Sequence, residues 1–365
     1  MSFLNLKTEA FGLDINDTSL KIIKLKKKHG FLQPVSFNEK KLEPGIIENG
    51  VIKNENVFTK NVKDAVFGVK GERLQTKYVV ASLPEEKSFS QVIQMPKMKE
   101  EELRSAVVFE AENYIPLPID KVYLDFQIIN PVAGQIDHLD VFIVAVEKSI
   151  VDSYISCLKK AGLVPLAIEV ETQAIARTLI KGEISLGPVV LIDFGGDNTD
   201  FIVFSGRSIR FTTSIPVSSK QITEAISRKL KVDFRKAEEM KKKYGLDSQI
   251  KSSRAHIVSG AMDPVLEELI IQIKKYLDFY TEHDFHEHFS EKNGIKKIIL
   301  SGGGVNLKGI DDFFSQKLGI PVELGNPWEN FSEKLKRVEL SEVKKNSLSF
   351  VTAMGLALRG VNNND

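Results

Sequence analysis

The sequence predicts an α/β protein made of two similar lobes, and three observations support this fold class. A short hairpin with an aspartate at its bend occurs twice, at residues 11–25 and again at 189–204. The two copies lie about half a chain apart, a separation close to the size of one domain and far longer than a solenoid repeat. With 365 residues, 42% of them hydrophobic, the chain can also bury more than one core.

Each hairpin shows the apolar pattern of a strand, a polar turn and a returning strand. In the first, residues 11–15 predict a strand, 16–19 a turn and 20–25 the second strand. In the second, the apolar run ends at Asp193, the glycine-rich turn covers 194–199, and the chain returns from Asp200. A sheet in each half of the chain follows from this repetition.

The first lobe carries an insert at about 84–150. Buried strands predicted at 78–83 and 141–146 bracket it. Inside it, a helix runs from the acidic stretch at residue 99 to Tyr114 and must stop at the two prolines that follow. A strand at 122–129 comes next, so the insert is expected to form a small unit of its own.

The remaining pattern sets the domain boundaries. In the first lobe we expect a helix at 149–161 and a strand at 163–169, with a further helix from Glu171. The second lobe shows helices at 220–230, 235–244, 264–280 and 309–318, and a strand at 297–300. We therefore predict a first lobe at 1–187, a second lobe at 188–345 with a helical subdomain at about 213–290, and a C-terminal helix at 346–365 that returns to the first lobe.

The composition excludes several classes of function. Lysine and arginine number 50 and aspartate and glutamate 49, so overall charge favours neither nucleic acid nor an anionic membrane. No apolar run approaches the roughly 20 residues of a membrane span, and no export signal is visible at the start. The single cysteine, Cys157, excludes a disulfide framework. These features predict a cytoplasmic protein that does not insert into a membrane.

Three turns that each follow an apolar strand are candidates for phosphate binding. They lie at 16–19, 195–199 and 302–304, and their glycines and hydroxyls can present backbone N–H groups to an anion. Asp14 and Asp193 would face one another between the lobes, where two carboxylates can hold a hydrated magnesium ion beside a polyphosphate. Each turn alone is a weak signal, but the ordered set suits ATP.

The order of these segments resembles the phosphate 1, phosphate 2 and adenosine motifs of the actin-like ATPase fold. More specifically, the chain is similar to the PilM family of type IV pilus assembly, which is related to the division protein FtsA. The segments that carry this resemblance, besides the three turns, are 110–118, 122–127, 237–245 and 353–359. The resemblance spans about residues 11–360 and implies a duplicated, ribonuclease H-like two-lobed ATPase fold with an FtsA-type inserted subdomain.

The resemblance also implies roles for individual residues. Asp14 and Asp193 would act through water on Mg²⁺, and Glu171 would position a hydrolytic water. The residues expected to contact ATP besides these two aspartates are Asn16, Asp17, Thr18, Ser19 and Lys21 on one side of the phosphates, Gly195, Gly196, Asn198 and Thr199 on the other, Glu238 and Lys241 at the ribose and adenine, and Gly302, Gly303 and Gly304 along the adenosine pocket. Glu171 could equally be an ordinary acid at a helix start, favoured by the helix dipole.

One turn departs from the family pattern. Asn16 replaces the usual glycine, and Asp17 and Thr18 stand where the family has small serines. A carboxylate at position 17 would repel phosphates, so either it points away or nucleotide binding is weakened. A plain polar turn is the other interpretation, because both residues tolerate left-handed backbone angles. We expect ATP binding with slow or absent hydrolysis.

The resemblance further implies a partner. Members of the family bind a PilN-type inner-membrane protein, whose short N-terminal peptide would dock in a groove beside the insert, among other proteins of the assembly platform. The chain would thus lie at the inner membrane through its partners. The apolar residues Tyr114, Ile115 and Leu117 could help form that surface or only fix the insert to its lobe.

Two other function classes fit the same fold. A sugar kinase would transfer phosphate to a small molecule, but no polar substrate group with a base opposite the phosphate turns is evident. An FtsA-like filament protein would have a C-terminal membrane tether, which residues 361–365 do not provide. Phosphate transfer to a small molecule would favour the kinase, whereas capture of one membrane protein would favour the scaffold. A histidine cluster at 283–288 resembles a metal site, but its position at the end of a helix favours a solvated segment.

Overall fold

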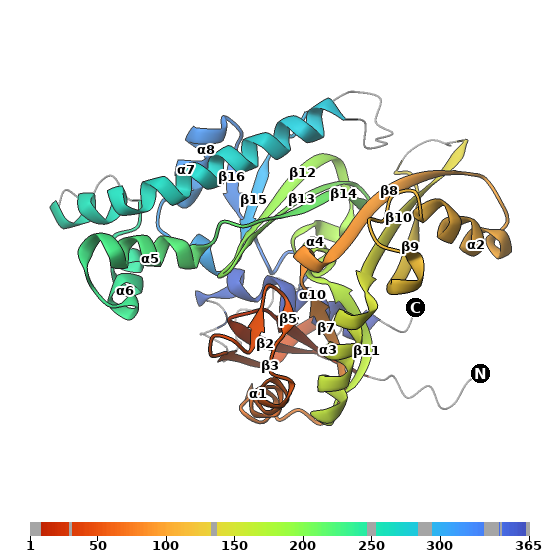
Figure 1. Ribbon diagram of the computed structural model, residues 1–365, viewed down its shortest axis with the longest axis horizontal. Coiled ribbons are helices and arrows are strands. Elements are labelled where there is room, and N and C mark those ends of the chain that lie inside the picture. The colour runs from red at the N-terminus through yellow and green to blue at the C-terminus, as the bar shows by residue number, and fades with distance from the viewer. Residues whose placement is uncertain are drawn as a thin grey trace.

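The computed structural model describes residues 9–28, 31–132, 137–246, 253–283, 294–331, 343 and 345–362. Three sheets organise these residues, as Figure 1 shows. We keep the names first lobe, insert and second lobe for the regions built around the six-stranded, the three-stranded and the five-stranded sheet. A fourth, two-stranded sheet belongs to the first lobe.

The first lobe contains the six-stranded sheet, in the order β11-β7-β1-β2-β3-β6. Strand β1 pairs antiparallel with β2 and parallel with β7, so the predicted first hairpin is present. The strands of this lobe are β1 (Phe11–Ile15), β2 (Ser19–Lys28), β3 (Phe31–Lys41), β6 (Lys70–Gly71), β7 (Tyr78–Leu83), β11 (Val164–Val170) and the small hairpin β4 (Ile47–Glu48) and β5 (Val51–Ile52). Its helices are α1 (Glu55–Phe67), α3 (Lys148–Lys160) and α4 (Glu171–Leu179), with η3 (Lys181–Glu183) after them.

The second lobe repeats the central pattern. In its sheet, ordered β14-β13-β12-β15-β16, strand β12 pairs antiparallel with β13 and parallel with β15, as β1 does with β2 and β7. The strands are β12 (Ser185–Phe194), β13 (Thr199–Gly206), β14 (Ser208–Ile215), β15 (Ile298–Ser301) and β16 (Val322–Leu324). The helices are α5 (Ser219–Leu230), α6 (Phe234–Tyr244), α7 (Ser253–Glu282) and α8 (Ile310–Leu318), with η4 (Gly303–Asn306) after β15. The duplicated α/β fold is thereby confirmed.

The insert has a core of its own. Its sheet runs β8-β10-β9, with β8 (Ser88–Pro96), β9 (Val122–Ile129) and β10 (His138–Glu147), and the helix α2 (Glu100–Ala111) packs on it. The short turns η1 (Glu85–Lys87) and η2 (Ile119–Lys121) complete it. Ile115 is buried in this core, whereas Tyr114 and Leu117 are 40% and 42% exposed. Figure 1 shows the insert projecting to one side of both lobes.

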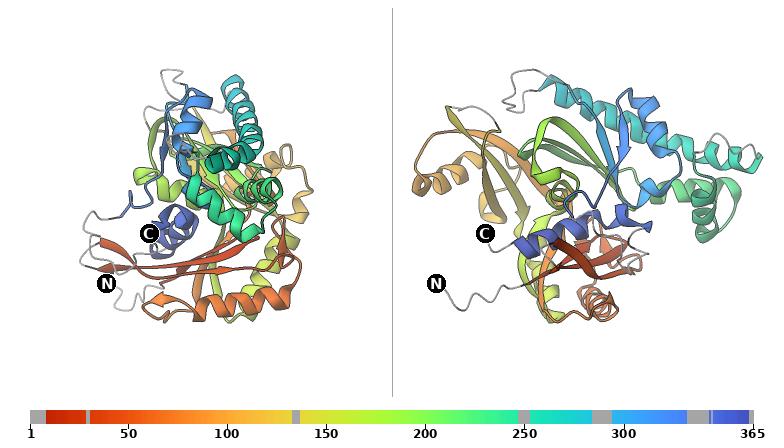
Figure 2. Two further views of the ribbon diagram at one scale, coloured as in Figure 1. Left: turned by 90° about the vertical axis from the view of Figure 1, so that its left-hand side faces the viewer. Right: turned by 180° about the vertical axis from the view of Figure 1, so that it is seen from behind.

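The helix α10 (Val351–Asn362) joins the far end of the chain to the first lobe, following η6 (Ser347–Phe350). It packs on β1 and α4, and Figure 2 shows it crossing the first-lobe sheet. Glycines permit this close approach. A Cβ at Gly12 would lie 2.3 Å from the carbonyl oxygen of Ala353, and one at Gly355 would lie 2.0 Å from that of Ala174.

Helix α7 is longer than the sequence predicts. We expected it to begin at Pro264, because proline is common in the first turn of a helix. Instead it begins at Ser253, and Pro264 lies inside it. Val258 and Met262 before the proline are fully buried and continue the apolar face of Leu266 after it. The buried contacts of that face therefore offset the cost of about 3 kcal/mol of an internal proline.

Candidate functional site

The first two predicted phosphate turns meet between the lobes. A Cβ at Gly196 would lie 3.1 Å from the Oγ1 of Thr18, so the two turns approach each other closely. The amide oxygen of Asn16 accepts hydrogen bonds from the backbone N–H groups of Thr18 (3.2 Å) and Ser19 (2.8 Å). Asn16 thus shapes the first turn, which is the role of a polar turn residue.

The second turn is anchored within its own lobe. Its Gly195 N–H donates to the Asn198 carbonyl at 2.9 Å, and the Asn198 side chain donates to Ser214 Oγ at 2.8 Å. The Thr199 hydroxyl donates to the Val217 carbonyl. These bonds fix the position of the second turn relative to its own lobe.

Acidic side chains and one lysine gather where the turns meet. Lys21 Nζ lies 3.1 Å from Asp14 Oδ2, and both side chains are largely buried. Burial acts to lower the pKa of Lys21, but nearby carboxylates, Asp14 foremost and Asp193 from the other lobe, outweigh it and raise that pKa. Asp193 accepts a hydrogen bond from Ser301 at 2.6 Å, and burial raises its pKa to about 6. The two predicted metal-binding acids therefore lie within electrostatic reach of one another.

Glu171 lies near the same acidic side chains, where the two phosphate turns meet. It is the first residue of α4, and its Oε1 accepts a hydrogen bond from the backbone N–H of Glu85 at 3.0 Å. Burial and the charges of Asp200 and Asp14 raise the pKa of Glu171 well above its usual range. We call the group formed by Asp14, Lys21, Glu171, Asp193 and Asp200 the interlobe site.

Two residues near this site were missed from the sequence. Asp200, one residue beyond the predicted turn, is 2% exposed, and its Oδ1 has no hydrogen-bond partner among the described residues. The sequence did contain a signal for Asp200, because it is a charged residue paired with Asp193 in a hairpin whose other residues are mostly apolar. Glu85 is also buried, and burial raises its pKa to about 7. It gave no signal, since a Pro-Glu-Glu sequence is typical of a surface turn.

Asp17 is held by the small hairpin of the first lobe, although burial and the Asp17 charge together raise the pKa of Asp197 in the second phosphate turn. The Asp17 carboxylate accepts hydrogen bonds from the backbone N–H groups of Asn49 (2.6 Å) and Gly50 (3.0 Å). Both residues adopt left-handed backbone angles, with φ of 48° and 71°, so the turn between β4 and β5 presents two adjacent donors to one carboxylate. The departure at position 17 thus has a structural explanation.

Replacing Asp17 by asparagine is therefore expected to affect stability more than nucleotide binding. The amide keeps the shape but loses the charge that strengthens both hydrogen bonds, which lowers the free energy of unfolding by about 1–2 kcal/mol. Urea unfolding measures this loss, and calorimetry is expected to show ATP affinity within about threefold. Asp120→Asn in the insert serves as the control. Much tighter ATP binding by the Asp17 variant would show that its charge does act on the phosphates.

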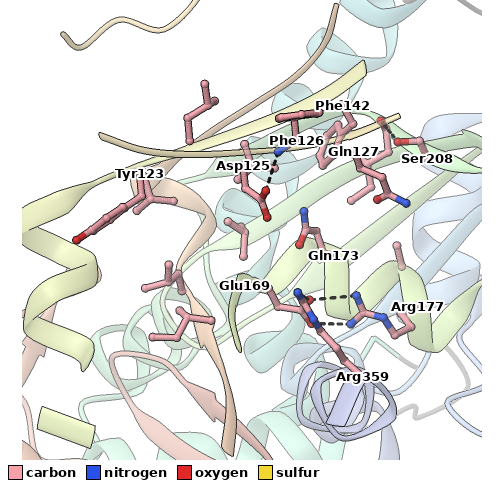
Figure 3. A pocket seen from close by; sticks show the side chains of 18 of the residues that line it. Tyr123, Asp125, Phe126, Gln127, Phe142, Glu169, Gln173, Arg177, Ser208 and Arg359 are labelled. Carbon is pink, nitrogen blue, oxygen red and sulfur yellow. Dashed lines mark hydrogen bonds and ion pairs between the residues drawn. The ribbon is translucent and has the colours of Figure 1, made fainter. Parts of the chain in front are cut away.

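A second site lies between the insert and both lobes. It is a cavity of about 310 Å³, and Figure 3 shows its lining. Strands β9 and β11, each the outermost strand of its own sheet, contribute to its walls, as does the turn between β13 and β14. The lining includes Tyr123, Leu124, Asp125, Phe126 and Gln127 from β9, Ile168, Glu169 and Val170 from β11, Gln173 and Arg177 from α4, Arg207, Ser208 and Ile209 from the second lobe, and Arg359 from α10. We call this cavity the groove.

An ion-pair cluster lies on one wall of the groove. The carboxylate of Glu169 is almost fully buried and receives the Arg177 guanidinium at 2.5 and 3.0 Å. Arg359 of α10 pairs with the same carboxylate and keeps a third of its side chain exposed. Figure 3 shows Gln173 between this cluster and the strand that carries Gln127. The groove therefore combines apolar walls, two strand edges and a few oriented polar groups.

Comparison with known proteins identifies the family. The sequence profile of the family described as type IV pilus assembly protein PilM matches residues 12–361. The chain belongs to the PilM family. A solved structure described as a PilM–PilN type IV pilus biogenesis complex superimposes with a TM-score of 0.80, at 28% identity over 97% of this chain and 99% of that one.

More distant relatives share part of the sequence or the fold. The cell division protein FtsA of Helicobacter pylori strain J99 is 28% identical over 233 residues, which are 57% of this chain and 46% of that protein. The chain thus spans about half the length of the curated relatives that it matches. MreB 5 of Spiroplasma citri bound to AMPPNP, at 15% identity over 96% of both chains, has a TM-score of 0.51 and shows a similar fold. The actin-like fold expected from the sequence is confirmed.

Other predicted contacts of this PilM-family chain are only partly open to a ligand. Lys241 is buried, and its ammonium group lies within hydrogen-bond distance of Ser219, Thr223 and Glu238. The ammonium group has three N–H donors, and the contact between α5 and α6 offers an acceptor for each of them. Lys241 could therefore donate to adenine only by losing one of these hydrogen bonds. Its nucleotide contact, and that of Glu238, stay predictions.

The third glycine turn has one open position. A Cβ at Gly302, where φ is +92°, would meet the Phe194 backbone at 2.5 Å, and one at Gly304 would meet the Phe194 ring at 2.5 Å. A Cβ at Gly303 would meet no atom within 4 Å. Gly302 and Gly304 are therefore required for packing, and Gly303 is the one of the three that faces open space. Their contacts with adenosine stay predictions.

Two further expectations concern metals and membranes. Within the described ranges, no group of three or more histidine, cysteine or acidic side chains has the arrangement of a metal site. Of the predicted histidine cluster, residues 284–288 lie outside the described residues. None of the helices described combines the length and the apolar character that a bilayer span requires.

Proposed function

We propose that this PilM-family protein is an ATP-binding adaptor of the inner-membrane platform that assembles a type IV pilus or a related secretion system. In this role it holds the cytoplasmic N-terminal peptide of a PilN-type membrane protein. The observation that carries the proposal is the groove, where the edges of two different sheets meet beside the insert. The related structure, 28% identical, is described as a complex of PilM with PilN.

The groove suits an extended peptide. An outermost strand has unpaired backbone groups, and a peptide that adds to it gains main-chain hydrogen bonds while its alternate side chains enter pockets. Tyr123 on β9 is 47% exposed and offers an apolar ring at the groove. Phe142 and Val144 of β10 add apolar wall beside it. Such an arrangement binds a short segment without a large flat interface.

The interlobe site suits magnesium and a nucleotide. Asp14 and Asp193 would hold the hydrated ion, and the unpaired oxygen of Asp200 would accept a hydrogen bond from its water. Lys21 would face the terminal phosphate, and the two phosphate turns would supply N–H groups. Four carboxylates around one lysine leave an excess of negative charge, which a divalent cation would balance. Bound ATP would contact both phosphate turns at once through its phosphate groups.

Slow or absent hydrolysis follows from the state of Glu171. An acid that positions a hydrolytic water must accept a hydrogen bond from it. One oxygen of Glu171 already accepts the N–H of Glu85, and burial with the charges of Asp200 and Asp14 raises its pKa, which disfavours the ionised form that accepts hydrogen bonds best. We therefore infer an ATP-binding scaffold that lies at the inner membrane through PilN and other platform proteins. A sugar kinase and a division filament stay less favoured, since the family match is to pilus assembly.

A groove-filling substitution tests the peptide site. In Gln173→Trp, the indole would occupy space between α4 and β9, so binding of a synthetic N-terminal PilN-type peptide is expected to weaken at least tenfold. Fluorescence anisotropy with the labelled peptide measures this. Gln272→Trp on α7, the same change on a helix remote from the groove, is the control and should bind within twofold of the native chain. Native affinity in the Gln173 variant would place the peptide elsewhere.

A further inference from the structure

Strand β14 runs from the groove to the second phosphate turn. Along its length it contacts the groove, the insert, the first lobe and that turn. At its start, Ser208 and Ile209 line the groove. Near its other end, Ser214 accepts the hydrogen bond of Asn198 from the phosphate turn, at 2.8 Å. Because β14 is the outermost strand of the second-lobe sheet, its free edge faces the insert strand β8.

The middle of the strand is bonded to the start of the insert through a buried carboxylate. The Thr212 hydroxyl donates to Glu85 Oε1. The other oxygen of Glu85 accepts from Thr172 of α4 at 2.9 Å and from Ser88 of β8 at 3.3 Å. Glu85 is 5% exposed, so water competes little for these bonds. One side chain thus connects the first lobe, the insert and the second lobe.

A buried ion pair fixes β14 to the insert a second time. Arg210 Nη1 lies 3.1 Å from Asp140 Oδ2 of β10, with the two side chains 4% and 1% exposed. The pairing of β13 with β14 shifts by one residue at this point, and the resulting bulge falls at Arg210. Strand β10 also forms a wall of the groove. Movement of β14 would therefore shift the insert and the groove with it.

We propose that β14 couples the interlobe site to the groove, with Thr212 and Glu85 as its positioning residues. This inference rests on the proposed function, since it concerns how ATP and the peptide affect one another. ATP would hold the two phosphate turns together, and Asn198 would hold Ser214. That keeps Thr212 against Glu85 and the groove in the shape described here. Each ligand therefore strengthens binding of the other by the same factor.

The decisive experiment compares peptide affinity with and without saturating ATP and magnesium. For the native chain we expect about tenfold tighter peptide binding in the presence of ATP. In Thr212→Val, which keeps the shape and removes the hydroxyl, the ATP effect is expected to fall below twofold, while ATP alone and the peptide alone bind within threefold of native. Thr213→Val is the matched control, because alternate residues of a strand face opposite sides, and it should keep the tenfold effect.

The outcomes are separable. A tenfold ATP effect that persists in Thr212→Val overturns the coupling, as does a native chain that binds both ligands without any effect of one on the other. In both cases the proposed function stands. Failure of the native chain to bind either ligand would defeat the proposed function itself. If Thr212→Val does not fold, Thr212→Ala replaces it, and its ATP effect is likewise expected to fall below twofold.

Discussion

Replacing Asp193 by asparagine is expected to weaken the binding of ATP and magnesium by at least tenfold. The change removes a half-buried charge at the point where both lobes contribute acids, and a charge-assisted contact is worth about 1.5–3 kcal/mol. Asp14→Asn should act in the same way, although it also leaves Lys21 without its partner at 3.1 Å. Calorimetric titration with ATP, with and without magnesium, measures the effect.

The pH dependence gives the same prediction an independent measurement. Because the pKa of Asp193 is raised to about 6, its carboxyl is ionised at pH 7 and gains a proton as the pH falls toward 5. Native affinity for ATP and magnesium should therefore fall over that range. In Asp193→Asn this part of the pH dependence should be absent. Asp120→Asn is the control, since Asp120 lies in the insert, away from the interlobe site. Unchanged titrations for both Asp14→Asn and Asp193→Asn would remove the magnesium assignment.

The largest loss of stability is expected from Gly355→Ala. A methyl group at this position would lie 2.0 Å from the carbonyl oxygen of Ala174, and the backbone of α4 cannot move away without disturbing the first lobe. Overpacking a core typically lowers the free energy of unfolding by about 1–3 kcal/mol. A clash with backbone atoms is expected to cost about 3 kcal/mol or more, because the backbone cannot adopt another rotamer. We expect the free energy of unfolding to fall by about 3 kcal/mol or more in urea.

A second helical glycine supplies the control. At Gly260, inside α7, an added Cβ would meet no atom within 4 Å. Gly260→Ala is therefore expected to stabilise the protein by up to about 1 kcal/mol, because alanine loses less backbone entropy in a helix. If the two alanine variants were equally stable, α10 would not pack on α4 as described.

Much of the fold could be predicted from the sequence, because hairpins, glycine turns and apolar periodicity are local signals. The two aspartate hairpins, the insert and the order of the glycine turns all left such signals. Helix α7 shows the limit. Pro264 is a strong local signal for a helix start, but buried residues on both sides of it continue one apolar face, and tertiary packing decides where the helix begins.

The site was predictable only in part. Asp14 and Asp193 repeat a pattern within the sequence, so their approach between the lobes could be expected. The contacts of Asp17 and Glu85 could not, since each depends on residues far along the chain. Asp17 meets a turn at Asn49, and Glu85 meets Thr212 of the other lobe. Such contacts form only when the lobes and the insert are assembled.

The position of α10 has a consequence for how the chain folds during synthesis. Residues near the end of the sequence, among them Phe350 and Met354, complete the core that covers Ile23 and Leu25 of β2. A ribosome-bound chain that already contains all six strands of the first-lobe sheet still lacks this cover. The face of the second-lobe sheet that α5, α7 and α8 cover contains no residue of α10 and can close earlier, whereas the opposite face also packs against Val351. Chaperones would thus meet the apolar face of β2 until α10 has been synthesised, long after the strands of the first lobe are complete.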